Sequence, residues 1–434
     1  MFPHERVVIR RGAESGLPII VAVHSTALGQ ALGGCRMKAY SQWRDGLEDA
    51  LRLSAAMSEK CALAGMPHGG GKTVIVTPAH DFDRTAALHD AGTVIEELAG
   101  LYATGPDVGT GPADMVTIAD RTRHVFCRPT THGGSGDSSP ATAFGTVAAL
   151  KAVCAKLSGQ SPAAPLTSNP AAAPSSGRNA WAAPSSGHAA SGPSSGHAAS
   201  GPSSGHAASG PSSGHHTASA PSSGRNAGGR VLSGPNATGG TIDVGDVGDV
   251  RDVRDDGLAG RSFAVLGLGH VGERVARLLA EAGAKLVVSD IDPARREVAA
   301  ELGATWATPE ECLTAEVDVL VPAALGGLLT PAMVPALRCR AVAGPANNQL
   351  DAPATAGLLH ERGILWAPDY VVSAGGVLRA TAVELHHETP AQVTARLNGI
   401  ASTLTGIFAA AERDGVTPAA AAANEARRRM NPRG

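Results

Sequence analysis

The sequence has few cysteines, little net charge and no long apolar run. None of its six cysteines forms a Cys-x-x-Cys pair, which argues against a structural zinc site or a secreted disulfide framework. No apolar run approaches the roughly 18 residues of a membrane span, and residues 1–11 are charged where a signal peptide is apolar. The net charge of -3 excludes a basic nucleic-acid binder. We therefore expect a cytoplasmic protein with no metal site and no nucleic-acid or membrane partner.

A biased segment of Pro, Ser, Gly, Ala and His occupies residues 160–256. The nine-residue sequence PSSGHAASG occurs in register from Pro184, Pro193 and Pro202, and no copy has the apolar residues that a stacked repeat would bury. We therefore predict a disordered insertion rather than a solenoid. The rest of the chain is long enough for two domains.

Apolar patterns on both sides of the insertion alternate between strand and helix. Short apolar runs predict strands at 19–23, 74–76, 263–266, 285–289, 317–321, 341–343 and 364–367. Helical spacing covers 45–61, 141–157, 273–281 and 391–430. This alternation is typical of an α/β fold with a parallel sheet.

Residues 267–272 read Gly-Leu-Gly-His-Val-Gly, between a predicted strand and a predicted helix. In such a motif the first glycine allows a tight turn, the second lets the backbone approach a pyrophosphate, and the third lets helix and strand pack closely. Asp290 ends the next strand, where a carboxylate binds ribose hydroxyls and repels a 2′-phosphate, so NAD is favoured over NADP. A solvated acid at a strand end is the other interpretation, and Arg295 and Arg296 lie nearby. The predicted cofactor-binding residues of this motif are Gly267, Gly269, His270, Val271, Gly272 and Asp290.

A second glycine-rich segment, residues 60–73, contains Lys60 and Lys72. A phosphate loop would need glycine where Met66 stands, and it would follow a strand instead of preceding one, so nucleoside triphosphate hydrolysis is excluded. We predict instead that three glycines hold Lys72 in a tight, partly buried turn, where desolvation lowers its pKa. Asp107 is a candidate partner, although an aspartate that bonds turn amides is the alternative.

These segments together resemble the leucine/valine/phenylalanine dehydrogenase branch of the glutamate dehydrogenase superfamily, closest to the valine and leucine enzymes. The matching segments occur in family order: ALGGCRM at 31–37, DALRLSAAMSEK at 49–60, GGGKTVI at 69–75, DVGT at 107–110, SPATA at 139–143, GLGHVG at 267–272, PAALGG at 322–327, ANNQL at 346–350 and WAPDYVVSAGG at 366–376.

The resemblance implies two domains separated by a cleft and a homo-oligomeric assembly. A substrate and oligomerisation domain would span 1–135, and a Rossmann-like, doubly wound NAD domain would span 136–159 and 257–380. Helices at 381–434 would return to the substrate domain.

The resemblance also implies residue roles. Lys60 would bind the α-carboxylate of an L-amino acid, Lys72 would be the catalytic lysine, and Asp107 would exchange protons with the amine. The other implied site residues are Gly33 and Gly34 lining the site, Thr142, Asn347 and Asn348 holding nicotinamide or substrate, and Leu32 with Val377 in the side-chain pocket.

The predicted function is the reversible NAD-dependent oxidative deamination of a branched-chain or other apolar L-amino acid. Aliphatic Leu32 argues against a dicarboxylic substrate. Three departures from the family pattern affect substrate choice: Pro106, Ser373 and Ala380. An aromatic amino acid dehydrogenase is the alternative within the class, because the small Ala380 would widen the pocket. A catalytically impaired NAD-binding interaction protein is the alternative of another class.

Overall fold

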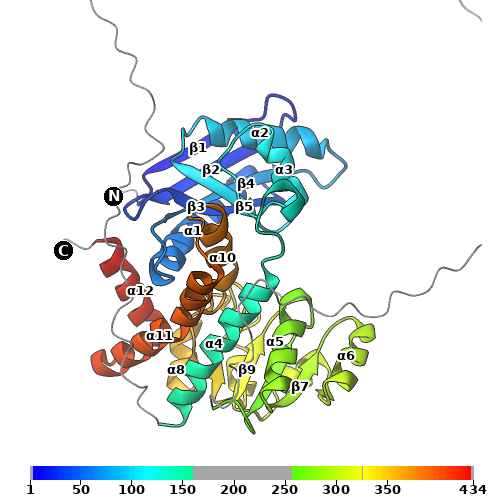
Figure 1. Cartoon of the computed structure of the whole chain (residues 1–434), viewed down its shortest axis with the longest axis vertical. Helices are drawn as coiled ribbons and strands as arrows, with labels where there is room; N and C mark the ends of the chain where they lie inside the picture. Colours follow the sequence, from blue (N-terminus) through cyan, green and yellow to red (C-terminus); the bar gives the residue numbers. More distant parts are fainter. Residues whose placement is uncertain (1–2, 160–256, 325, 432–434) are drawn as a thin grey trace, which may run out of the picture. The chain divides into compact units, whose positions relative to one another are not determined.

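Two β-sheets with their own helices form the fold of the computed structural model, which describes residues 3–159, 257–324 and 326–431 (Figure 1). All of these residues belong to one compact unit. The predicted disordered insertion at 160–256 lies outside the described residues. Within the described ranges, no helix combines the length and apolar character that crossing a membrane requires.

The first sheet has the strand order β1-β2-β4-β3-β5. Its strands are β1 (Arg6–Arg11), β2 (Pro18–Ser25), β3 (Ala31–Ala39), β4 (Gly69–Thr77) and β5 (Tyr102–Pro106). Strands β1, β2 and β4 pair antiparallel, whereas β3 runs parallel to both β4 and β5. Helices α1 (Trp43–Leu63), α2 (Arg84–Glu96) and α3 (Pro112–Ala119) belong to this sheet.

Strand β2 is buried on both faces, which explains its unbroken apolar run. Ile19, Val21 and Val23 pack in one cluster with residues of α2 and α3, while Ile20 and Ala22 pack in another with residues of α1. The period of two along a strand gives this division. The strands predicted at 19–23 and 74–76 are confirmed as parts of β2 and β4.

The predicted tight turn around Lys72 is wrong. Residues 69–72 lie inside β4, between β2 and β3. The glycines serve close packing: a Cβ on Gly70 would lie 2.0 Å from the Ser58 amide nitrogen of α1, and one on Gly71 would lie 2.5 Å from the Tyr102 ring. A glycine-rich segment can therefore be a central strand where a helix and a ring approach its backbone.

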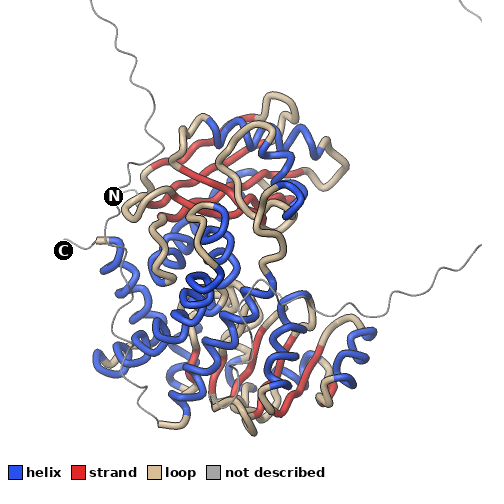
Figure 2. Tube along the Cα trace, in the orientation of Figure 1, coloured by secondary structure: helices blue, strands red, loops and turns tan. Residues whose placement is uncertain are grey.

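The second sheet is a doubly wound parallel sheet with the order β11-β10-β9-β6-β7-β8. Figure 2 draws the strands of both sheets in red and the helices in blue. Its strands are β6 (Ser262–Leu266), β7 (Lys285–Ser289), β8 (Thr305–Trp306), β9 (Val319–Pro322), β10 (Ala341–Val342) and β11 (Leu365–Trp366). The chain starts at β6, moves outward to β8, and resumes on the other side at β9. The predicted Rossmann-like fold is confirmed, and ligands bind such folds where the strand order reverses, here between β6 and β9.

Helices cover both faces of this sheet. Phe263 and Val265 of β6 pack in one cluster with residues of α4, α5 and α11, and Ala264 packs in another with residues of α7 and α8. The helices are α4 (Ser139–Leu157), α5 (His270–Glu281), α6 (Arg296–Glu301), α7 (Pro309–Leu313), α8 (Thr355–Glu361), α9 (Asp369–Val372), α10 (Gly375–Glu384), α11 (Pro390–Asp414) and α12 (Pro418–Met430). Single-turn 3-10 helices lie at Thr130–His132, Pro293–Arg295 and Val334–Ala336.

The helical C-terminal part is confirmed, with a break at Gly415. This residue caps α11 with a φ of 61°, a conformation that glycine adopts without strain. Helix α12 then packs on α1, and Arg429 donates hydrogen bonds to the carbonyl oxygens of Ala62 and Leu63. These carbonyls end α1, so the arginine satisfies acceptors that have no partner within the helix.

Candidate active site

Lys72 is buried on the first sheet, where it forms an ion pair with the partly exposed Asp107. Lys72 Nζ lies 2.7 Å from Asp107 Oδ2, and the lysine side chain is 6% exposed. Lys72 belongs to β4 and Asp107 follows β5, with β3 between these two strands. A Cβ on Gly34 of β3 would lie 2.7 Å from Asp107 Cβ and 3.3 Å from Lys72 Nζ. Glycine at this position therefore allows the two side chains to meet across the strand.

Gly33 serves a different purpose from Gly34. A Cβ at this position would lie 1.9 Å from the carbonyl oxygen of Gly71. The absence of a side chain lets β3 pair closely with β4, so both glycines shape the backbone around Lys72.

Burial and charge set the protonation of this pair. Burial lowers the pKa of Lys72, and the Asp107 carboxylate offsets this only in part. Burial alone would raise the pKa of Asp107, but the positive charges of Lys72 and Arg36 outweigh it and lower that pKa. The pair therefore combines an ionised carboxylate with a lysine that releases its proton more readily than usual.

Asp107 does not use its carboxylate to close the turn that it begins. Its backbone N–H donates to Thr110 Oγ1 at 3.0 Å, and the Thr110 hydroxyl donates to the carbonyl oxygen of Cys35 at 2.7 Å. The structure thus favours the interpretation of Asp107 as the partner of Lys72.

Lys60 is in the last turn of α1, beside the loops of the second sheet. Its Nζ donates to Asn347 Oδ1 at 3.0 Å and to Ser373 Oγ at 2.9 Å. Burial lowers the pKa of Lys60, and the Asp369 carboxylate acts in the opposite direction. The charge of Lys72 also lowers the pKa of Lys60. The two lysines therefore influence each other electrostatically.

The two asparagines have different surroundings. Asn347 contacts Lys60, whereas the Asn348 side chain accepts a hydrogen bond from Arg52 at 3.4 Å. Asn348 also has a φ of 54° and its carbonyl oxygen accepts from the Gly327 N–H at 2.6 Å. Asn347 is thus the asparagine that contacts Lys60.

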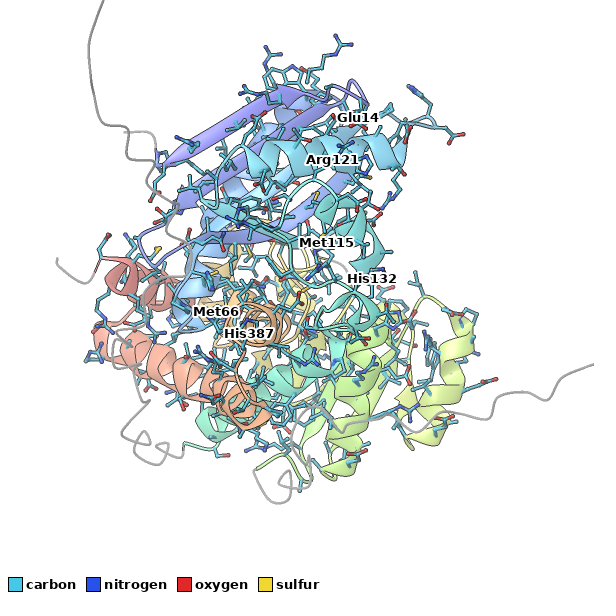
Figure 3. The ribbon with its side chains drawn as sticks, turned by 45° about the horizontal axis from the view of Figure 1, so that its top comes forward. Glu14, Met66, Met115, Arg121, His132 and His387 are labelled. Carbon is cyan, nitrogen blue, oxygen red and sulfur yellow. The ribbon has the colours of Figure 1, made fainter. Side chains whose placement is uncertain are left out.

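Leu32 and Val377 meet in one apolar cluster. Leu32 is fully buried on β3, and Val377 of α10 packs against the cluster, which also includes Ala380 and Met66. Met66 is labelled in Figure 3. Thr142 of α4 lies near the start of α10, because a Cβ on Gly376 would lie 2.6 Å from its hydroxyl oxygen. The Thr142 hydroxyl donates to the carbonyl oxygen of Ser138.

The glycines of residues 267–272 shape the turn between β6 and α5. Gly267 has a φ of 102°, and its Cβ would lie 2.9 Å from the Ala324 amide nitrogen. A Cβ on Gly272 would lie 2.0 Å from the Gly267 carbonyl oxygen, whereas one on Gly269 would meet no atom within 4 Å. Only the second glycine thus faces open space, as a backbone that receives a pyrophosphate requires. The turn therefore fits a dinucleotide.

Helix α5 begins directly after this turn, at His270. His270 is exposed and Val271 is partly buried. The first N–H groups of a helix carry a partial positive charge and attract phosphate. The start of α5 can therefore hold the anionic part of a dinucleotide.

Family comparisons agree with this geometry. Residues 5–124 match the model described as "Glu/Leu/Phe/Val dehydrogenase, dimerisation domain", and residues 291–430 match "Glutamate/Leucine/Phenylalanine/Valine dehydrogenase". Leucine dehydrogenase from Geobacillus stearothermophilus is 31% identical, over 99% of this chain and 91% of that protein. The chain belongs to the Glu/Leu/Phe/Val dehydrogenase family.

Further comparisons extend across the family. Valine dehydrogenase from Streptomyces virginiae is 32% identical, over 99% of this chain and 94% of the relative. The crystal structure of L-tryptophan dehydrogenase from Nostoc punctiforme is 27% identical with a TM-score of 0.69, covering 99% and 97% of the two chains. Residues 245–331 also match the model "D-isomer specific 2-hydroxyacid dehydrogenase, NAD binding domain". The predictions of family membership, of an oxidoreductase and of NAD as cofactor are confirmed.

Asp290 directly follows β7, the strand that pairs with β6. Its Oδ2 accepts a hydrogen bond from the Leu268 N–H at 2.6 Å, and its Oδ1 accepts from the Asp292 N–H at 2.9 Å. Arg295 pairs with Glu273 at 3.0 Å, and Arg296 lies over the Trp306 ring. The nearby arginines thus have other partners, and Asp290 supports the glycine-rich turn itself.

Sequence reasoning missed Arg36 as a member of this dehydrogenase site. Its Nε donates to Asp107 Oδ2 at 2.8 Å. The available signal was the period of two along β3, which places Leu32, Gly34 and Arg36 on one face. That signal depends on knowing that residues 31–39 form a strand, which the sequence pattern did not predict.

Proposed function

We propose that this chain catalyses the reversible NAD-dependent oxidative deamination of a branched-chain or other apolar L-amino acid to the 2-oxo acid and ammonia. The observation that carries the proposal is the Lys72–Asp107 ion pair, with Lys60 within electrostatic range of both groups. Two lysines and a carboxylate in one place match the charges of an amino acid, whose carboxylate needs a cation and whose amine needs a proton acceptor.

Each of these residues has a role in the proposed reaction. Lys60 binds the α-carboxylate through its ammonium group. Asp107 accepts a proton from the substrate ammonium, so that the amine can lose a hydride from Cα. Lys72, as a neutral amine, then accepts a proton from the water that attacks the iminium carbon. Its lowered pKa makes the neutral form accessible.

The second sheet holds the cofactor in this proposal. When bound, NAD accepts the hydride from the substrate Cα. Gly267, Gly269 and Gly272 shape the turn, and the N–H groups of His270 and Val271 at the start of α5 would hold the pyrophosphate. Asp290 binds the adenosine ribose, while Thr142, Asn347 and Asn348 hold nicotinamide or substrate.

The apolar cluster of Leu32, Val377 and Ala380 supports the proposed substrate class. Leu32, Val377 and Ala380 contribute to one cluster, and a second carboxylate placed among them would lose its hydration without gaining a cation. This disfavours glutamate. The small, buried Ala380 supports the second candidate, an aromatic amino acid dehydrogenase of the phenylalanine type.

A panel of L-amino acids tests the proposal by measuring NAD reduction with purified protein. We expect leucine, valine or isoleucine to give the highest kcat/KM and glutamate little activity. The D-amino acids are the matched control and should be inactive. Fastest turnover of phenylalanine or tryptophan would select the second candidate. NAD binding without oxidation of any L-amino acid would contradict the proposal and favour an NAD-binding interaction protein.

We also propose that the chain forms a homo-oligomer and works in the cytoplasm. Residues 5–124 match a model described as a dimerisation domain, which supports the first statement. All six cysteines are free and buried, which fits a reducing compartment. Light scattering after size exclusion measures the assembly, and a monomer at all concentrations would contradict it.

The domain boundaries remain those proposed from the sequence. Residues 1–135 would form the substrate and oligomerisation domain, residues 136–159 and 257–380 would form the NAD domain, and residues 381–434 would return to the first through α12, while α11 packs against the second sheet. The bridge between Thr104 and Val125 supports this division, since it extends the first sheet beyond β5. The packing of α12 on α1 also supports it.

A further inference from the structure

Arg36 of β3 joins two partly exposed carboxylates, Asp49 on α1 and Asp107 directly after β5. Its Nε donates to Asp107 Oδ2 at 2.8 Å, and its NH1 group donates to Asp49 Oδ2 at 2.6 Å. The Arg36 side chain is 11% exposed. Because Lys72 also contacts Asp107 Oδ2, at 2.7 Å, one carboxylate oxygen is shared by an arginine and a lysine.

Asp49 anchors the other end of Arg36. It accepts hydrogen bonds from the Tyr40 hydroxyl at 2.7 Å and from Arg52 at 2.6 Å. Burial alone would raise the pKa of Asp49, but its bonds with Tyr40 and the nearby charge of Arg36 lower it. Asp49 is therefore an ionised partner, which fixes the guanidinium between two strands and a helix.

The shared oxygen matters because the two cations differ in chemistry. A lysine amine can lose its proton, whereas a guanidinium remains charged at any pH at which a protein works. When Lys72 is neutral, as the proposed reaction requires, Arg36 is the cation that still compensates Asp107. Without it, the carboxylate would be partly buried without a partner, which favours its protonation and opposes release of the Lys72 proton.

Only one oxygen of Asp107 is used in this arrangement. Among the residues that the structure describes, hydrogen bonds to the carboxylate end on Oδ2. A carboxylate held by one oxygen presents the other to a ligand.

We propose that Arg36, held by Asp49, is a positioning residue of this dehydrogenase: it fixes Asp107 through Oδ2 and supplies the permanent positive charge that this carboxylate needs when Lys72 is a neutral amine. The inference rests on the proposed function of Lys72 and Asp107.

The other titratable groups near Lys72 do not replace Arg36. Cys35 lies on the opposite face of β3, in the cluster with Ile19 and Val21, and burial raises the pKa of its thiol to about 12, so it is neutral during turnover. Lys60 adds a positive charge on the side of the second sheet. Arg36 itself lowers the pKa of Lys72, so its removal should raise that pKa.

Arg36→Gln tests this role through the pH dependence of kcat with the best substrate of the panel. Since Lys72 must be neutral, its raised pKa should move the rising limb of kcat to higher pH by about one unit. The KM for NAD should stay unchanged, because Arg36 belongs to the first sheet. Arg36→Lys keeps the positive charge but loses the two-pronged geometry. Its pH profile should therefore lie between those of the wild type and Arg36→Gln.

Arg121→Gln is the matched control. Arg121 pairs with Glu14 at 2.8 Å, and both residues are labelled in Figure 3 near the first sheet. This pair is exposed and has no contact with Asp107. The pH profile of kcat for Arg121→Gln should therefore coincide with that of the wild type. A lower kcat in Arg36→Gln with an unshifted profile would overturn the proposal and leave Arg36 a purely structural role.

Competitive acetylation of Lys72 at a series of pH values gives a readout that needs no turnover. Mass spectrometry of the Lys72 peptide should show a higher apparent pKa in Arg36→Gln than in the wild type. An equal value would overturn the inference. If the wild type oxidises no amino acid, the proposed function fails, and the labelling still decides whether Arg36 and Lys72 are coupled. If Arg36→Gln does not fold, the same two measurements on Arg36→Lys decide the matter.

Discussion

Lys72 is the residue on which the proposed chemistry depends most, because its amine is buried against a carboxylate. Lys72→Ala should lower kcat by about a thousandfold, as the loss of a positioned proton acceptor usually does. NAD affinity should remain nearly unchanged, since Lys72 lies on β4 and the dinucleotide turn lies after β6. Steady-state rates and the quenching of protein fluorescence by NAD measure the two effects.

The exposed Lys285, at the start of β7, provides the control for this substitution. Lys285→Ala should retain wild-type rates. In the wild type, kcat should rise with pH as Lys72 loses its proton, at a lower pH than an ordinary lysine requires, because burial lowers the Lys72 pKa. Substantial turnover by Lys72→Ala would refute the assignment.

Asp290 combines a structural bond with a role in cofactor choice. Asp290→Ser should reduce the preference for NAD over NADP by about fivefold to tenfold, since removing one partly exposed charge repulsion is worth on the order of 1 kcal/mol. The serine hydroxyl can still accept a bond from the Leu268 N–H, so the turn should survive. The kcat/KM values for the two cofactors measure the effect.

Asp292→Ser serves as the neighbouring control. The Asp292 side chain accepts a bond from the Ala294 N–H within its own turn, so its loss should leave the cofactor ratio unchanged. A wild-type enzyme that already prefers NADP would show that the Asp290 carboxylate has been misinterpreted.

At the scale of elements, strand β4 depends on residues without side chains. Gly70→Ala should lower the free energy of unfolding by about 1–3 kcal/mol, because the new Cβ would meet the backbone of α1 at Ser58. Thermal unfolding followed by circular dichroism measures the loss. Gly357→Ala in α8 is the matched control, since a Cβ there meets no atom within 4 Å and alanine favours a helix. Equal melting temperatures for the two variants would contradict this account of β4.

Elements whose pattern is local could be predicted from the sequence, and those defined by distant contacts could not. The run Ile19–Val23 and the strand-turn-helix around Gly267 carry their own signals. Strand β3 contains two glycines and is recognisable only through its pairing with β4 and β5. The residues around Lys72 fit either a turn or a strand, and contacts with Ser58 and Tyr102 decide between them.

The site shows the same division. The resemblance to a family supplied Lys60, Lys72 and Asp107, and the structure pairs Lys72 with Asp107 while Lys60 contacts Asn347 and Ser373. It did not supply Arg36, because a residue that acts through another leaves no chemical motif of its own. Its role depends on its distances to Asp107 and Asp49, which only the fold defines.

For the whole molecule, the main prediction concerns residues 160–256. The Arg261 guanidinium contacts the Ser158 hydroxyl, and Arg340 donates to the Leu157 carbonyl oxygen at 3.1 Å. The described residues that flank this segment, Ser158 and Arg261, are thus neighbours. Replacing the segment with a few Gly and Ser residues should preserve folding and NAD-dependent activity, because loop closure entropy depends only weakly on loop length.

Melting temperature, assembly state and kcat of this deletion variant should match those of the full chain. The control replaces part of α4 with the same Gly and Ser linker. Because α4 packs against α5, α10 and α11, this variant should not fold. Loss of active protein on removing residues 160–256 alone would reveal a structural contribution of that segment.

The nearness of Ser158 and Arg261 also means that the polypeptide need not be continuous there. A protease cut between residues 160 and 256 would give one piece with the complete first sheet and α4, and another with the complete second sheet. Helix α4 would then hold the two pieces together without a covalent link, because it packs against α5, α10 and α11 of the other piece. The chain is in this sense already divided into two complementary halves, which could be encoded as separate polypeptides and joined by co-expression.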